Sequence, residues 1–147
     1  MRITKGHLRF SHEEIWNAGE RVASCIFNSL LQIKNSERVG YPVDLTAEKW
    51  NECLDKILFS FKEISTCYKN DPFEIYFREN LKKEFSDFEV DENNCLIDKI
   101  EIPDYVFENS KKYKEKIKEG LNLYSKYYMD LWDLLDLLIK KRTENDW

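Results

Sequence analysis

Residues 110–142 read SKKYKEKIKEGLNLYSKYYMDLWDLLDLLIKKR, and this stretch decides the fold class. Apolar residues recur along it at alternating intervals of four and three, namely Ile117, Leu121, Tyr124, Tyr128, Leu131, Leu135 and Leu138. This spacing places one apolar seam along an α-helix, against which another helix packs. Further apolar residues widen the seam: Phe107, Tyr113, Trp132, Leu134 and Ile139. A stripe this broad is typical of a helix buried in a bundle.

The composition supports a folded, mainly helical protein. The chain of 147 residues is 42 % hydrophobic and 14 % aromatic, which suits one domain with a real core. Only four glycines and three prolines occur, so turns are few and the elements between them are long. We therefore expect a single helical domain over residues 1–147, an antiparallel bundle of three to four helices preceded by an N-terminal arm or short strand at 1–10.

An earlier helix is predicted over residues 11–35. It begins with a capping box of Ser11 and Glu14, in which each side chain satisfies an unpaired backbone amide. Its apolar face comprises Ile15, Trp16, Val22, Ala23, Ile26, Phe27, Leu30 and Ile33. Gly19 in this helix and Gly120 in the last helix each predict a point where another backbone approaches closely. At Gly120 a slight kink is the alternative.

Another helix is predicted from a cap at Thr46 or Asp44 to the Asn-Asp-Pro sequence at 70–72. Its core face comprises Trp50, Leu54, Ile57, Leu58, Phe61 and Ile64. Pro72 suits the first position of a third helix, along which Phe73, Phe77, Leu81 and Phe85 recur every four residues. The turn-prone residues 91–94 separate two short apolar stretches, which predicts a β-hairpin at about 87–102. The last helix then starts at Asp104 or Ser110.

The charge is unevenly distributed along the chain. Residues 71–108 contain twelve acids and four bases, a balance of −8, which leaves +3 for the rest of a chain whose net charge is −5. We read residues 70–104 as an acidic insertion suited to a basic partner surface. This profile disfavours binding to a nucleic-acid duplex.

No pattern of catalytic or metal-binding residues stands out. The four cysteines form no C-x-x-C pair, and His7 and His12 are the only histidines, which excludes the usual zinc spacings. Phosphate-binding glycine loops and nucleophile motifs are missing. The acid row Asp130, Asp133 and Asp136 is interpreted as a solvated helix face. We expect no cofactor, no metal, reduced cysteines, and no signal peptide or membrane span.

Aromatic residues near bases give the candidate binding site. The predicted loop at 35–45, here named the GYP loop, contains Gly40, Tyr41 and Pro42, and a loop tyrosine has less reason to be buried than a helix one. Flat rings beside cations can stack a base and hold a phosphate. The candidate ligand-binding residues are Tyr41, Arg38, Lys49, Trp50, Trp16, Tyr124, Tyr128 and Trp132. Ordinary bundle core is the alternative for these residues, and for Trp50 and Tyr124 it is the favoured interpretation.

Three blocks of the sequence resemble a family of short uncharacterised proteins encoded by tailed bacteriophages and prophages. They are IWN at 15–17, GYPVDLTAEKW at 40–50 and GLNLYSKYYMDLWD at 120–133. The middle block is the most specific, and together the blocks cover three predicted helices. Two departures stand out: Ala18 and Gly19 replace an apolar-acidic pair, and the 70–104 stretch is longer and more acidic than usual.

The resemblance implies a phage gene product with no assigned activity, working in the cytoplasm of the infected bacterium. We hypothesise an accessory protein that counters host defence by binding, either sequestering a nucleotide-like immune signal or blocking a host defence protein. Its pocket is expected where the GYP loop meets the last helix, or at an oligomer interface. The alternatives are a structural or assembly module that forms homo-oligomers and, least favoured, a small hydrolase acting through Asp or Glu.

Overall fold

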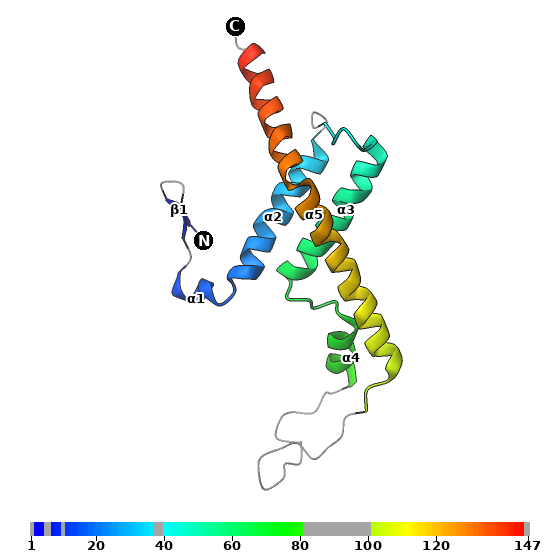
Figure 1. The fold of residues 1–147 in the computed structure, drawn as a ribbon. Helices are drawn as coiled ribbons and strands as arrows, with labels where there is room; N and C mark the ends of the chain where they lie inside the picture. Colours follow the sequence, from blue (N-terminus) through cyan, green and yellow to red (C-terminus); the bar gives the residue numbers. More distant parts are fainter. Residues whose placement is uncertain (1, 5–6, 10, 37–39, 81–100, 146–147) are drawn as a thin grey trace. The chain divides into compact units, whose positions relative to one another are not determined.

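The computed structural model describes residues 2–4, 7–9, 11–36, 40–80 and 101–145. This part of the chain is mainly helical, as predicted (Figure 1). Its elements are β1 (Arg2–Thr4), β2 (His7–Arg9), α1 (His12–Ile15), α2 (Ala18–Asn35), α3 (Ala47–Ser65), α4 (Pro72–Asn80) and α5 (Asp104–Asn145).

Two compact units make up the chain. The larger unit comprises Met1–Cys67 and Lys116–Trp147, and the smaller unit comprises Tyr68–Glu115. Each unit is described by itself. The expected single domain with an insertion at 70–104 stays a prediction, because a compact unit is defined by contacts and a domain by its ability to fold alone.

The core of the larger unit lies where α2, α3 and α5 meet. α2 and α3 run side by side in opposite directions (Figure 1), which the short connection between them favours. The buried cluster contains Ala23, Leu30, Trp50, Leu54, Ile57, Leu58, Phe61, Tyr127 and Leu131. Every residue in this cluster lies in a segment whose periodicity predicts a helix, so helical packing around one core is confirmed for this unit.

The predicted continuous helix over residues 11–35 is wrong at Trp16 and Asn17. α1 ends at Ile15 and α2 begins at Ala18, and Asn17 between them has φ −109° and ψ 22°. Trp16 is 85 % exposed and Ile15 is 60 % exposed. Burial of an apolar face contributes most of the stability of a helix in a protein. The exposed side chains of Ile15 and Trp16 contribute little of it, so the helix is interrupted at Trp16 and Asn17.

α3 begins as predicted and ends earlier than predicted. The Thr46 hydroxyl caps it by accepting a hydrogen bond from the Lys49 amide at 3.3 Å. The helix ends at Ser65, well before the Asn-Asp-Pro sequence. Cys67 and Tyr68 both have φ 55°, in the left-handed region that terminates helices and that side chains other than glycine adopt at a cost.

The first nine residues contain a short antiparallel hairpin in place of a plain arm. β1 pairs with β2, and Ile3 lies opposite Leu8.

The smaller unit starts α4 at Pro72, as predicted. The Asp71 carboxylate accepts a hydrogen bond from the Phe73 amide at 2.9 Å and lies 3.6 Å from the Lys114 ammonium. The Phe73 ring lies 5.6 Å from that of Phe77 and 5.8 Å from that of Phe107. The predicted continuation of α4 through Leu81 and Phe85 falls in residues 81–100, outside the described residues, as does most of the predicted hairpin at 87–102.

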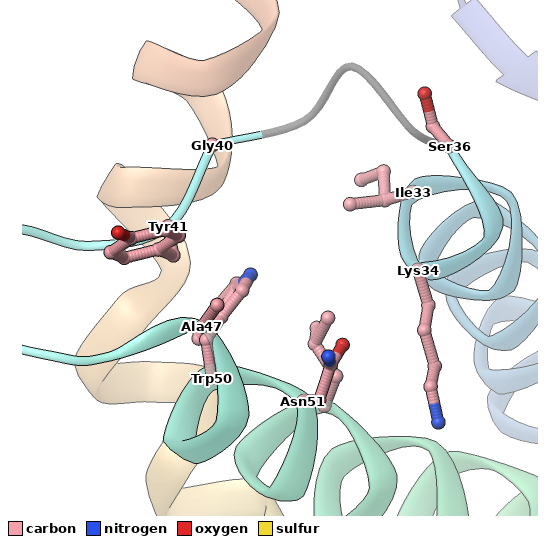
Figure 2. A pocket seen from close by; sticks show the side chains of 9 residues that line it. Ile33, Lys34, Ser36, Gly40, Tyr41, Ala47, Trp50 and Asn51 are labelled. Atoms are coloured by element: carbon pink, nitrogen blue, oxygen red, sulfur yellow. The ribbon is translucent and has the colours of Figure 1, made fainter.

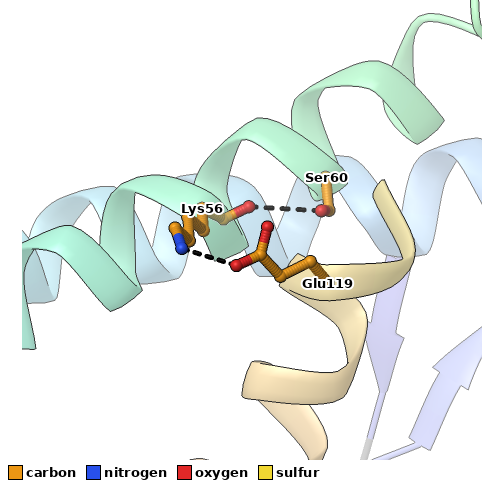
Figure 3. A network of polar contacts seen from close by, with 3 residues as sticks. All are labelled: Lys56, Ser60 and Glu119. Atoms are coloured by element: carbon orange, nitrogen blue, oxygen red, sulfur yellow. Dashed lines mark hydrogen bonds and ion pairs between the residues drawn. The ribbon is translucent and has the colours of Figure 1, made fainter. Parts of the chain in front are cut away.

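α3 and α5 touch backbone to backbone at Gly120. A methyl group at Gly120 would overlap the Ser60 hydroxyl and the Lys56 carbonyl oxygen. The buried Ser60 hydroxyl lies 2.8 Å from the carbonyl oxygen of Ile117 and 3.2 Å from that of Lys56, and these two acceptors share its single proton. Figure 3 shows the contact of Ser60 with Lys56 beside the ion pair of Lys56 and Glu119, whose N–O distance is 2.5 Å. The predicted close approach at Gly120 is confirmed.

The same contact shifts the seam of α5. In the larger unit its inward positions are Ile117, Gly120, Tyr124, Tyr127 and Leu131. Tyr127 is therefore buried in place of the predicted Tyr128, which is 40 % exposed, and Gly120 faces α3 in place of Leu121, which packs beside the core. Because glycine carries no side chain, α3 approaches most closely there and turns that face of α5 inward. The side chains of Trp132, Leu134, Leu135, Leu138 and Ile139 lie outside the described residues.

Alanine substitutions at the two helical glycines should have opposite effects on the free energy of unfolding. Gly120→Ala places a methyl group into the α3 backbone and should lower the free energy of unfolding by about 1–3 kcal/mol. Among the described residues, a methyl group at Gly19 would meet no atom of another element within 4 Å, so the predicted close approach is wrong for this part of the chain. Gly19→Ala should accordingly raise the free energy of unfolding by up to about 1 kcal/mol. Urea denaturation of both variants checks this, and equal effects would contradict the described contact.

Candidate functional site

The part of the GYP loop from Gly40 onward is held on the larger unit by a buried proline and a hydrogen bond to α5, and a turn within the loop braces it. Pro42 is buried, and its carbonyl oxygen accepts a hydrogen bond from the Leu45 amide at 3.0 Å. The Tyr127 hydroxyl of α5 donates to the Asp44 carboxylate at 3.4 Å. A loop anchored this way presents its remaining side chains in a defined place.

A pocket of about 160 Å³ opens beneath this loop (Figure 2). It lies between the end of α2, the loop and the first two turns of α3. The polar and aromatic groups that line it come from Lys34, Ser36, Tyr41, Trp50 and Asn51. None of the described residues that line it belongs to α5, so this pocket is not at the expected joint with the last helix, and a pocket at that joint stays a prediction.

Tyr41 and Trp50 line the pocket together but in different environments. Tyr41 is 51 % exposed at the rim, whereas Trp50 is 4 % exposed and belongs to the core. The Trp50 ring meets the Tyr127 ring at a centroid distance of 5.5 Å and an interplanar angle of 75°, an edge-to-face contact of the kind aromatic rings prefer. Trp50 thus forms the floor of the pocket while it supports the loop anchor.

The cations near the pocket are not placed beside the Tyr41 ring as the predicted site requires. Lys34 lines the pocket, but its ammonium forms an ion pair with the Asp55 carboxylate and extends away from the Tyr41 ring (Figure 2). Lys49 is exposed and lies on the flank of α3 opposite Asn51, since two residues along a helix turn by about 200°. Arg38 lies outside the described residues.

The other predicted site residues lie away from this pocket. Tyr124 is partly buried, with its ring 4.8 Å from that of Phe61 and 5.4 Å from that of Tyr128. Trp16 is exposed at the junction of α1 and α2. The side chain of Trp132 lies outside the described residues. The structure therefore brings together two of the eight predicted ligand-binding residues, Tyr41 and Trp50.

Sequence reasoning missed Ser36 and Asn51 as lining residues and Tyr127 as the loop anchor. Asn51 carries a usable signal, because the residue after a core tryptophan lies on the flank of the same helix. Tyr127 follows Gly120 by seven residues, which places both on one helix face. Ser36 gives no signal that separates it from other loop residues.

Two electrostatic effects accompany the anchor. The Lys126 ammonium lies 4.8 Å from the centre of the Tyr127 ring. Hydrogen bonding to Tyr127 and the charge of that phenol raise the pKa of Lys126, and the Asp44 carboxylate adds to the increase. Burial raises the pKa of Tyr124, with a further contribution from the charge of Tyr128. At neutral pH Lys126 is therefore charged and Tyr124 is neutral.

The comparisons with known proteins identify no relative: no family model, curated protein or solved structure matches this chain. Within the described ranges, no group of three or more His, Cys, Asp or Glu side chains is placed to hold a metal ion. None of the helices in the described part of the chain combines the length and apolarity that a membrane crossing requires. Cys25, Cys53 and Cys67 are not joined in disulfides, and Cys95 lies outside the described residues.

Removing the anchor hydrogen bond should loosen the loop with little loss of stability. Tyr127→Phe keeps the ring contact with Trp50 but removes the bond to Asp44, and should lower the free energy of unfolding by about 0.5–1 kcal/mol. Amide hydrogen exchange should become faster at residues 43–46. Tyr124→Phe is the matched control, since Tyr124 does not contact the loop anchor, and equal loop exchange in both variants would contradict the assignment.

The raised pKa of Tyr124 predicts a loss of stability in alkali. The folded state holds this proton more tightly than the unfolded chain, whose tyrosines titrate near about 10. The contribution is therefore fully present below that pH and is lost as the pH rises through the pKa of the folded state. Ultraviolet titration of tyrosinate should show a late-titrating phenol that disappears in Tyr124→Phe and remains in Tyr41→Phe.

Proposed function

We propose that this chain is an accessory protein of phage infection that acts by binding in the cytoplasm of the host and counters host defence. The half-exposed Tyr41 ring at the rim of a pocket, on a loop anchored to the core, carries the proposal. Loop residues are exposed without functional need in many proteins, but an anchored loop with an aromatic ring over a pocket is typical of a recognition site.

The blocks that resemble the phage family support this proposal by their positions. In the middle block, Tyr41 lines the pocket, Pro42 is buried, Asp44 accepts the bond from Tyr127, and Thr46 caps α3. In the last block, Gly120 contacts α3 and Tyr127 holds the loop. Both blocks thus bear on the same loop and pocket, which is what a shared binding function would require.

Of the two modes of binding, the size and charge of the pocket favour blocking a host protein over sequestering a free nucleotide. Sites for drug-sized ligands have volumes of roughly 300–1,000 Å³, whereas this pocket has about 160 Å³. It accommodates one ring or one side chain. Lys34, the charged residue of its lining, is already paired with Asp55, so a phosphate would have to compete with that carboxylate.

Binding is proposed rather than catalysis, because the described lining joins no nucleophile to a base. A homo-oligomeric assembly module is the second candidate, and exposed apolar residues of the larger unit favour it. Ile15, Trp16 and Val22 are exposed at and just after the junction of α1 and α2, and grouped apolar surface of this kind marks interaction sites. Light scattering after size exclusion distinguishes an oligomer that Trp16→Ala disrupts from a monomer.

Tyr41→Ala should weaken partner binding by about tenfold or more, since exposed aromatic anchors dominate interfaces. Its stability should change by less than about 1 kcal/mol, because half of the ring is already in solvent. The experiment compares host proteins retained by immobilised wild type and variant, measured by quantitative mass spectrometry. A parallel incubation with cyclic and ADP-ribose-type nucleotides, followed by recovery after heating, separates a sequestered ligand from an altered one.

Tyr105→Ala is the matched control, because Tyr105 is an exposed tyrosine of the smaller unit. It should retain the same host proteins as wild type. Retention of no host protein and recovery of no nucleotide by the wild-type chain would contradict the counter-defence function.

A further inference from the structure

The exposed face of α3 beside the pocket is acidic. Glu48, Glu52 and Asp55 are exposed and recur at intervals of four and three, which aligns them along one side of the helix. Asn51, one residue before Glu52, lines the pocket. Glu48 and Asp55, three residues before and four residues after Asn51, therefore lie beside the pocket on the first turns of α3.

The cations of this region neutralise that face only in part. Lys34 pairs with Asp55, so its charge is not available to Glu48 or Glu52. Lys56 follows Glu52 by one helical turn, but the Lys56 ammonium is paired with Glu119 of α5, and this pairing raises the pKa of Lys56, with a smaller contribution from the charge of Glu52. Lys49 lies beside Lys56 by the helical repeat, on the side of α3 away from Asn51. A ligand that approaches the pocket over Asn51 therefore meets a negative potential, which repels phosphate and attracts lysine or arginine.

We propose that the pocket binds a basic segment of a partner protein, which inserts one aromatic or large apolar side chain beside Tyr41 and places lysine or arginine along Glu48 and Glu52. The inference rests on the proposed binding function and specifies its partner. The pocket volume matches a single inserted side chain, and the charge of the neighbouring face selects the residues around it. Tyr41 and the Trp50 floor provide the aromatic surfaces for that side chain.

Short labelled peptides test this proposal directly. The first peptide has a central tryptophan between two pairs of lysines, the second replaces the tryptophan by alanine, and the third replaces the lysines by glutamates. Fluorescence anisotropy measures their binding to the full chain, with ADP-ribose as an anionic competitor. Burial of a large ring predicts that the first peptide binds at least about tenfold more tightly than the second. Charge predicts that it also binds more tightly than the third.

Charge reversal tests the acidic face. Glu52→Lys should weaken binding of the lysine peptide by roughly three- to tenfold and strengthen binding of the glutamate peptide, because an attractive rim contact becomes repulsive. The difference in peptide affinity between wild type and Glu52→Lys should shrink as the salt concentration rises from about 0.1 M to about 1 M, because the screening length falls from about 10 Å to about 3 Å. Glu79→Lys makes the same change of charge on an exposed residue of the smaller unit and should leave both affinities unchanged.

Three outcomes would overturn the inference. Binding of ADP-ribose without binding of the lysine–tryptophan peptide would assign the pocket to an anionic ligand and leave the proposed binding function standing. If Tyr41→Ala leaves peptide binding intact, and if Glu79→Lys weakens it as much as Glu52→Lys does, the peptide binds by general charge attraction and not in the pocket. If neither probe binds at millimolar concentration, this pocket is not a binding site. If host proteins are not retained either, the proposed function is wrong as well.

Discussion

The close approach of α3 and α5 at Gly120 is the constraint on which the larger unit depends. With no side chain at that position, the Ser60 hydroxyl reaches the Ile117 carbonyl oxygen at 2.8 Å, and the Lys56 backbone lies against the glycine. This contact sets the rotation of α5, which turns Tyr124, Tyr127 and Leu131 toward α3. Leu54 and Ile57 of α3 complete the core beside them, and close packing of that core fixes the rotation further.

The position of Tyr127 links this helix contact to the candidate site. Because α5 turns Tyr127 inward, its ring packs edge-on against Trp50 and its hydroxyl reaches Asp44. The GYP loop is thereby joined to the core at the place where Tyr41 rims the pocket. The site is small and borders an acidic helix face, so its chemistry suits a basic protein segment better than a nucleotide.

Helix existence, the Thr46 cap and the start of α4 at Pro72 could be predicted, because each depends on residues near one another in the chain. A glycine inside a helix also predicted the close contact at Gly120, whose partners Lys56 and Ser60 are distant in the chain, but the same signal was wrong at Gly19. The break at Trp16, the end of α3 at Ser65 and the open surroundings of Gly19 could not. Those features depend on which helix faces pack against another element and on the left-handed backbone conformation of Cys67 and Tyr68. For the site, the position of Tyr41 in a loop was predictable. Its exposure depends on the fold, and Ser36 and Asn51 enter the pocket through the meeting of α2 and α3.

The sequence by itself determined a mainly helical protein with an aromatic loop between two amphipathic helices, since periodicity and turn residues are local properties. Only the tertiary structure decided which residues of α5 face inward. Apolar spacing alone favoured Leu121 and Tyr128, and the small size of Gly120 moved the buried face to Gly120 and Tyr127. The buried face depends on how closely the backbones of α3 and α5 approach, and this distance cannot be derived from the sequence of either helix alone.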